Sequence, residues 1–141
     1  MICYEMIGYF SEEPGSQHFP DSGLAKLYLD TGNFIIVVGI TKFEEFNHKV
    51  YSLMVDNSAI DIQIVNFPSS NYLAGLSDQR NYWEFGYNAL MINDTSFARN
   101  PHYHQASDTI NTLDFNKMTE VVNSTYNAVI GFNENKPNIT L

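Results

Sequence analysis

The fold class follows from Phe34–Val55, which reads FIIVVGITKFEEFNHKVYSLMV. Its first seven residues are apolar and mostly β-branched, and an uninterrupted run of this kind is typical of a strand covered on both faces, as in a parallel sheet. Thr41 and Glu44 have the spacing of a capping box and predict the start of a helix. Five apolar side chains at helical spacing predict its buried face: Phe43, Phe46, Val50, Leu53 and Met54.

The rest of the chain continues this alternation of strands and helices. Strands are predicted over residues 2–9, 60–64 and 88–92, and the second of them alternates isoleucine with polar residues, which indicates one less covered face. Residues 11–30 contain several proline and glycine turn signals and are expected to be mostly loop. The expected class is therefore α/β, with part of a mixed, mostly parallel sheet flanked by helices.

The clearest helix lies near the end of the chain, at about residues 115–130. Asp114 is its expected N-cap and Gly131 its expected end. Its expected buried face consists of apolar residues at helical spacing: Phe115, Met118, Val121, Val122, Tyr126 and Val129. One domain is therefore expected over residues 1–132, followed by a polar tail over residues 133–141.

Charge and composition exclude several classes of partner. The chain has 16 acidic and 7 basic residues and a net charge of −9, which argues against nucleic acid or an anionic membrane surface as partner. No run approaches about eighteen consecutive apolar residues, so no transmembrane helix is predicted. The single cysteine, Cys3, lies in an apolar run and is expected to be a small buried side chain. No signal peptide follows Met1, and the sequence leaves the localisation open.

A long segment without helical or strand period follows the strand at 88–92, and it contains His102, His104 and Asp108. Long irregular loops inside compact domains are usually functional or disordered, and this one is too aromatic and too rich in histidine for a linker. The two histidines would point the same way in an extended backbone. Imidazole is a common zinc ligand whose second nitrogen needs a partner, for which Asp94 and Asp108 are candidates. On spacing alone the pair is weak evidence for a metal.

Two blocks of sequence carry a family resemblance. They are CYEMIGYFSEEPGSQHFP, residues 3–20, and SDQRNYWEFGYNALMINDTSFARNPHYHQASDT, residues 77–109. Together they resemble the zinc-dependent aminopeptidases, a family of co-catalytic di-zinc exopeptidases related to glutaminyl cyclases and glutamate carboxypeptidases. The resemblance runs in register from Cys3 to about Ile130. It implies a zinc-exopeptidase-like fold and an enzyme that removes N-terminal residues from a peptide substrate with two zinc ions. Most relatives are exported, so a secreted or periplasmic parent enzyme is an expectation of the resemblance.

The resemblance also implies roles for individual residues. Glu5 takes the position of the acidic ligand of one zinc, and His104 takes that of a ligand of the other zinc. Asp108 belongs to the residues that support the loop around the metals. Asp78 and Tyr103 match positions that line the substrate pocket. If the resemblance is set aside, a second interpretation of Glu5 is a carboxylate at a sheet edge that faces water. An unpaired carboxylate is costly to bury, so exposure to water would explain its place in an apolar run.

The chain departs from the family in two respects. Gln79 stands where many relatives have histidine, which puts the polarity of the pocket in doubt. The family's His-x-Asp motif, its bridging aspartate and its Glu-Glu pair precede the strand that holds Glu5, whereas only four residues precede Glu5 here. The chain is therefore expected to be the C-terminal portion of a longer aminopeptidase, inactive alone, whose partner is the missing N-terminal half or a second copy bound through exposed sheet surface. A stand-alone, non-catalytic binding or assembly module descended from the same fold stays open as the alternative.

Overall fold

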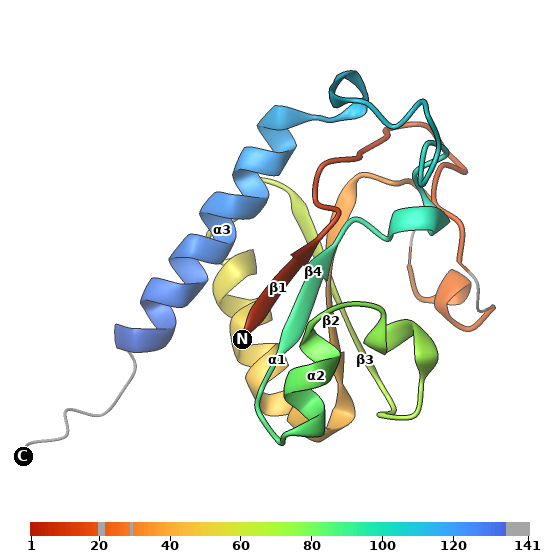
Figure 1. Cartoon of the computed structure of the whole chain (residues 1–141). Helices are drawn as coiled ribbons and strands as arrows, with labels where there is room; N and C mark the ends of the chain where they lie inside the picture. The colour runs from red at the N-terminus through yellow and green to blue at the C-terminus, as the bar shows by residue number, and fades with distance from the viewer. Residues whose placement is uncertain (20–21, 29, 135–141) are drawn as a thin grey trace, which may run out of the picture.

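The computed structural model describes residues 1–19, 22–28 and 30–134, and these form one sheet with helices packed on it (Figure 1). The strands are β1 (Ile2–Glu5), β2 (Phe34–Ile40), β3 (Asp61–Phe67) and β4 (Leu90–Asn93). The helices are α1 (Glu44–Val55), α2 (Gln79–Glu84) and α3 (Phe115–Glu134). Five short 3-10 turns lie at Leu24–Lys26, Thr41–Phe43, Tyr72–Gly75, Ser96–Ala98 and Ile110–Thr112.

The four strands lie in the order β1-β4-β2-β3. The pairs β1/β4 and β2/β3 are parallel, and β2/β4 is antiparallel, which confirms the expected mixed, mostly parallel sheet. As a consequence, the carboxyl ends of β1 and β4 lie at one end of the sheet along the strand direction. The carboxyl ends of β2 and β3 lie at the opposite end. All seven residues of β2 are buried, as the sequence predicts for a central strand.

The main core lies between one face of the sheet and helices α1 and α3, and it contains Ile35, Val37, Val50, Met54, Ile62, Leu90, Ile92, Val121 and Ala128. Alternate residues of the strands point to the other face, where the smaller core group of Phe34, Ile36, Val38 and Met91 lies. Loops and short turns cover that face, with Phe19, Val65 and Phe67 packed against it. The described residues include no helix that is both long and apolar enough to cross a membrane.

The expected end of β1 and the expected start of α1 are wrong. β1 ends at Glu5 and not near Tyr9, because Met6 has a φ of 54° and leaves the extended conformation. The capping box at Thr41 does not form: residues 41–43 make a 3-10 turn, α1 begins at Glu44, and no side chain caps it. The buried positions of α1 agree with the prediction, since Val50 and Met54 are in the core.

The start of α3 is as expected, but its buried face is not. Asp114 caps the helix, with its Oδ1 accepting from the Lys117 N–H at 3.0 Å. Tyr126 is 64% exposed and Phe115 is 50% exposed. Val121 is buried as expected, and the other buried side chains are small ones that the prediction did not include: Ser124, Thr125 and Ala128. These side chains let α3 pack closely on the rest of the core, and the bulky apolar residues are left on the outside.

Gly131 does not end α3, because the helix continues to Glu134. A Cβ at Gly131 would lie 3.1 Å from Cδ2 of Leu53 on α1, so close approach of the two helices explains the glycine. Residues 135–141, most of the expected tail, lie outside the described residues.

A second glycine contact predicts a measurable effect on stability. A Cβ at Gly39 of β2 would lie 2.1 Å from Nδ2 of Asn47, a fully buried side chain that donates to the Ile40 carbonyl and to Asn66 Oδ1. Gly39→Ala is therefore expected to lower the free energy of unfolding by about 1–3 kcal/mol in urea denaturation. The double variant Gly39→Ala/Asn47→Ala should lose less free energy of unfolding than the two single variants lose together, because Asn47→Ala removes the side chain that clashes with the new Cβ. Strict additivity would show that the clash is not the cause.

Candidate functional site

The candidate site lies at the end of the sheet formed by the carboxyl ends of β1 and β4. Glu5 and Asn93 are register partners there, and the Asn93 amide donates to the Glu5 carbonyl and to Ser96 Oγ. In the described part of the chain, four non-glycine residues have positive φ: Met6, Thr95, Ser96 and His104. All four follow the ends of β1 and β4. Backbone strain of this kind is often stored at functional sites, so this end of the sheet is the first place to look for one.

A pocket of about 220 Å³ opens at this end and extends over the loop-covered face of the sheet. Its floor is formed by alternate residues of three strands, which are Ile36, Val38, Val65 and Met91. Its rim is more polar and includes Glu5, Gln17, Thr95, Ser96 and Tyr103. Glu5 reaches this face because it points to the same side of the sheet as Asn93, its register partner. An apolar floor with a few polar groups at its mouth is typical of a small-molecule site.

Among the described residues, one hydroxyl donates to the Glu5 carboxylate. The Ser77 hydroxyl donates to Glu5 Oε2 at 2.8 Å, and Cys3 Sγ lies 3.6 Å from the same hydroxyl oxygen. Cys3 is buried, as expected. The Glu5 residue itself is exposed, which is compatible both with a metal ligand and with a carboxylate that faces water. Sequence reasoning did not single out Ser77, because its contact with Glu5 joins residues 72 positions apart.

The two histidines of the long loop do not lie on an extended backbone. Turn hydrogen bonds run from the Tyr103 N–H to the Asn100 carbonyl and from the Gln105 N–H to the His102 carbonyl. His102 Nδ1 lies 3.0 Å from Ser107 Oγ. His104 is exposed, and its ring stacks on Tyr103 with 3.9 Å between the centroids. His104 therefore adjoins a residue of the pocket rim through Tyr103.

The other predicted site residues are placed less tightly. Asp78 and Asp108 are exposed, and neither lines the pocket. Their expected roles stay predictions. Gln79 is fully buried, donates to the Ala74 carbonyl at 2.8 Å, and does not line the pocket. Gln79 therefore does not contribute to the polarity of this pocket.

The chain alone does not fit a catalytic zinc. Among the described residues, no group of three or more His, Cys, Asp or Glu side chains lies close enough to hold a metal ion. Catalytic zinc normally has about three protein ligands and a water. Glu5 and His104 remain candidates for single ligands whose partners would have to come from other residues.

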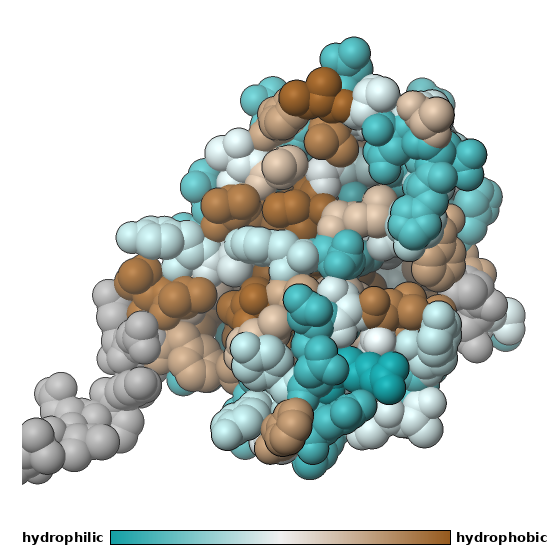
Figure 2. Space-filling view, viewed as in Figure 1, coloured by the Kyte–Doolittle hydropathy of each residue, from teal (hydrophilic) through white to brown (hydrophobic). Residues whose placement is uncertain are grey.

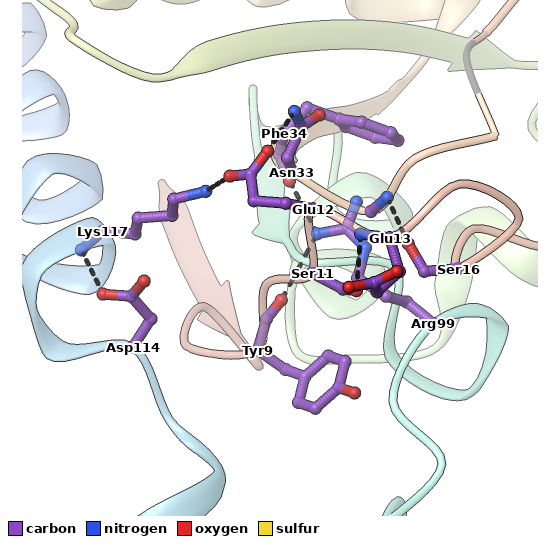
Figure 3. A network of polar contacts seen from close by, with 11 residues as sticks. Tyr9, Ser11, Glu12, Glu13, Ser16, Asn33, Phe34, Arg99, Asp114 and Lys117 are labelled. Atoms are coloured by element: carbon purple, nitrogen blue, oxygen red, sulfur yellow. Dashed lines mark hydrogen bonds and ion pairs between the residues drawn. The ribbon is translucent and has the colours of Figure 1, made fainter.

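A polar network centred on Arg99 joins the loop after β4 to the loop after β1 and to the start of β2, and Figure 3 shows part of it. Arg99 is 5% exposed, and it donates from Nε to Gln17 Oε1 at 2.8 Å and from Nη1 to the Phe34 carbonyl at 2.7 Å. Its guanidinium carbon lies 4.5 Å from the centroid of the Phe34 ring. Burial lowers the pKa of Arg99 to about 10. Nearby, Lys117 forms an ion pair with Glu12.

Asp94, which lies close enough to Arg99 for their charges to interact, is 1% exposed. It was a candidate to support a histidine, but its carboxylate instead accepts from the Tyr9 N–H at 2.9 Å and the Ser96 N–H at 3.0 Å. Burial raises the pKa of Asp94 to about 6, against the opposing effect of these hydrogen bonds and of the Arg99 charge. The network fixes the two loops that border the pocket, and sequence reasoning missed it.

Comparison with known proteins shows the fold and leaves the family open. No family model matches the chain. The chain is 38% identical over 126 residues to "Uncharacterized protein YfbL" of Escherichia coli K12, a match that covers 86% of this chain and 38% of that protein. Two crystal structures of the Legionella pneumophila aminopeptidase LapA superpose with a TM-score of 0.64 and 18% identity. They cover 93% of this chain, which spans 30% and 31% of theirs.

The fold is that of part of an aminopeptidase domain. This agrees with the fold expected from the sequence resemblance. At 18% identity the likeness to LapA concerns the fold alone. The chain spans well under half the length of the proteins that it matches.

Proposed function

We propose that this chain is the C-terminal portion of a zinc-dependent, aminopeptidase-type metallopeptidase that hydrolyses N-terminal peptide bonds. The observation that carries the proposal is the position of Glu5, at the carboxyl end of β1 and on the rim of the pocket, within a fold shared with LapA. Open α/β sheets place their ligand sites at this end of their strands. In the proposal, Glu5 and His104 each contribute one ligand to a pair of zinc ions, which would activate water and polarise the scissile carbonyl.

The pocket supports a peptide substrate with an apolar N-terminal side chain. Its floor of Ile36, Val38, Val65 and Met91 offers no charged group to such a side chain. Tyr103 and Glu5 on the rim would then lie near the backbone of the substrate. Asp78 and Asp108 are proposed to act from outside the pocket, by supporting the loops that carry Glu5 and His104.

The surface of the molecule supports a further polypeptide as partner. Several apolar side chains of α3 are at least 41% exposed, and apolar residues gather along this helix in Figure 2: Phe115, Val122, Tyr126, Val129 and Ile130. Beside them, Met1, Ile2, Phe46 and Val50 line an apolar groove of about 300 Å³. β1 is an edge strand of the sheet and can pair further. Exposed apolar surface of this kind is typical of a protein interface. We propose that the remaining part of a longer peptidase covers it and supplies the other zinc ligands and the general base.

Zinc titration of the chain, alone and co-produced with the unmatched part of YfbL, tests this proposal. The isolated chain is expected to bind zinc only weakly, since it offers single ligands. The combined protein is expected to bind zinc stoichiometrically and to release leucine from leucine p-nitroanilide. Glu5→Ala and His104→Ala should each weaken zinc binding in the combined protein by at least about tenfold. Glu45→Ala, at an exposed position of α1, is the matched control and should have no effect.

Two results would contradict the proposal. Stoichiometric zinc binding below micromolar concentration by the isolated chain would show a complete site that the structure does not contain. A stable combined protein without zinc or activity would favour the alternative, a non-catalytic binding or assembly module with the same fold.

A further inference from the structure

A second cleft lies at the opposite end of the sheet, next to the carboxyl ends of β2 and β3. Its volume is about 480 Å³. Lys42 follows β2, the turn at Ser69–Asn71 follows β3, and Arg80 and Trp83 of α2 close the cleft. The parallel pair β2/β3 thus has its own crevice outside its carboxyl ends, which is where ligands of open α/β sheets bind. This cleft is separate from the pocket that contains Glu5 and shares no lining residue with it.

The charge of the cleft is opposite to that of the protein. The chain has 7 basic residues and a net charge of −9, yet Lys42 and Arg80 both line this one cleft. Glu84 is the acidic residue in the lining, and Arg80 Nε contacts its Oε1 at 3.2 Å on the surface. The side chains of the lining therefore carry one excess positive charge. Other cations are engaged elsewhere, since Arg99 is buried beside Asp94 and Lys117 pairs with Glu12.

The polar groups of the cleft include several that can donate to a ligand. The Asn71 N–H donates to the Pro68 carbonyl at 2.9 Å and closes the turn after β3. Asn71 Oδ1 accepts from the Leu73 N–H at 2.8 Å, so its amide nitrogen is the group left to face a ligand. Within residues 30–134, the Ser69 and Ser70 hydroxyls and the Lys42 amine form no hydrogen bond, and the Lys42 amine lies 5.1 Å from the centroid of the Phe43 ring. An acceptor-rich ligand matches this set.

Contacts with the rest of the protein restrict the side chains of Arg80 and Trp83, which form the walls of the cleft. A Cβ at Gly75 would lie 3.2 Å from Arg80 Cδ, so the stem of Arg80 packs against the 3-10 turn of residues 72–75. The Trp83 indole is 9% exposed, and its Nε1 donates to the Ala89 carbonyl at 2.8 Å. Arg80 therefore presents its terminal nitrogens from a supported stem beside a fixed indole. A guanidinium with an ammonium nearby is the usual protein arrangement for a carboxylate or phosphate.

We propose that this cleft binds a small oxyanion, either phosphate or an organic carboxylate, through Lys42, Arg80 and the turn at residues 69–71. The site requires neither zinc nor Glu5, and it goes beyond the peptidase function proposed above. Because its charged groups are exposed, its affinity is expected to be modest and to fall as ionic strength rises.

Amide chemical shifts of the full chain, titrated with sodium phosphate at constant ionic strength, test the site. Saturable shifts are expected at residues 69–71, Lys42 and Arg80. Lys42→Gln and Arg80→Gln should each weaken phosphate binding by about tenfold or more, since each removes a charged donor. Lys49→Gln is the matched control and should bind phosphate like the parent chain. The Arg80–Glu84 pair is exposed, so Arg80→Gln should leave the fold intact.

A parallel titration with sodium acetate separates the two ligand classes. Tighter binding of acetate than of phosphate supports the oxyanion site and assigns it to carboxylates. Shifts that do not saturate, that spread evenly over all lysines, or that are equally weakened by Lys49→Gln would overturn the proposal. Loss of zinc or peptidase function would not bear on this result, because the test contains neither zinc nor substrate.

Discussion

Arg99→Met is expected to lower the free energy of unfolding by about 3–5 kcal/mol at pH 7, because it removes a buried guanidinium and its two charged hydrogen bonds to Gln17 and the Phe34 carbonyl. Asp94 would stay buried without the cation that opposes its desolvation. Gln17 and the Phe34 carbonyl would lose donors at 2.8 and 2.7 Å. In the described structure, Arg99 Nη2 has no hydrogen-bond partner, and its removal offsets part of the loss. The lower half of the range is therefore the better estimate.

Urea denaturation of three variants separates this effect from a general loss of positive charge. Arg80→Met removes an arginine whose ion pair is exposed and should change the free energy of unfolding by less than about 0.5 kcal/mol. Arg99→Lys keeps the positive charge but loses the planar guanidinium. Its free energy of unfolding should therefore lie between those of Arg99→Met and the parent chain. A loss of less than about 1 kcal/mol for Arg99→Met would show that the network does not hold the two loops together.

The parts of the fold that the sequence predicts well are those where burial alone sets the pattern. β2 is buried on both faces and reads as an unbroken apolar run, and α1 buries Val50 and Met54 from a regular apolar stripe. α3 was misread because its apolar residues outnumber those that it buries. Its core contacts use Ser124 and Ala128, whose small size matters only once α1 is opposite them.

The candidate site shows a similar division. The sequence predicts a strand that contains Glu5, and it predicts the loop that carries His104 from the lack of period, but it does not predict that the strand ends at Glu5. The partners of these residues could not be predicted, because they come from distant parts of the chain. Ser77 meets Glu5 across 72 positions, and Arg99 meets Gln17 across 82. Such contacts depend on strand order, and local patterns carry no information about it.

The strand order also explains how one short chain contains two separate clefts. β2 runs antiparallel to β4, so the carboxyl ends of the pair β1/β4 and those of the pair β2/β3 lie at opposite ends of the sheet. The acidic Glu5 lies at one end, and Lys42 and Arg80 lie near the other. The two proposed sites therefore lie at opposite ends of the strands and share no lining residue.

The stability of the fold is expected to fall between pH 4 and pH 7 because of Asp94. Its pKa in the folded protein is about 6, against an ordinary value of 3.8. The folded state therefore binds this proton more tightly than the unfolded state does. The resulting stabilisation is complete below pH 3.8 and is lost as the pH rises through 6, and it amounts to about 3 kcal/mol at most.

Comparison with Asp94→Asn isolates this contribution from that of the other carboxylates. The difference in unfolding free energy between the parent chain and Asp94→Asn should shift by up to about 3 kcal/mol in favour of the variant as the pH rises from 4 to 7. Asp108→Asn, at an exposed carboxylate, should follow the parent chain at every pH. In an Arg99→Met background the pKa of Asp94 should rise further, so the pH-dependent difference should extend above pH 7. Parallel pH profiles for the parent chain and Asp94→Asn would show that Asp94 does not titrate in this range.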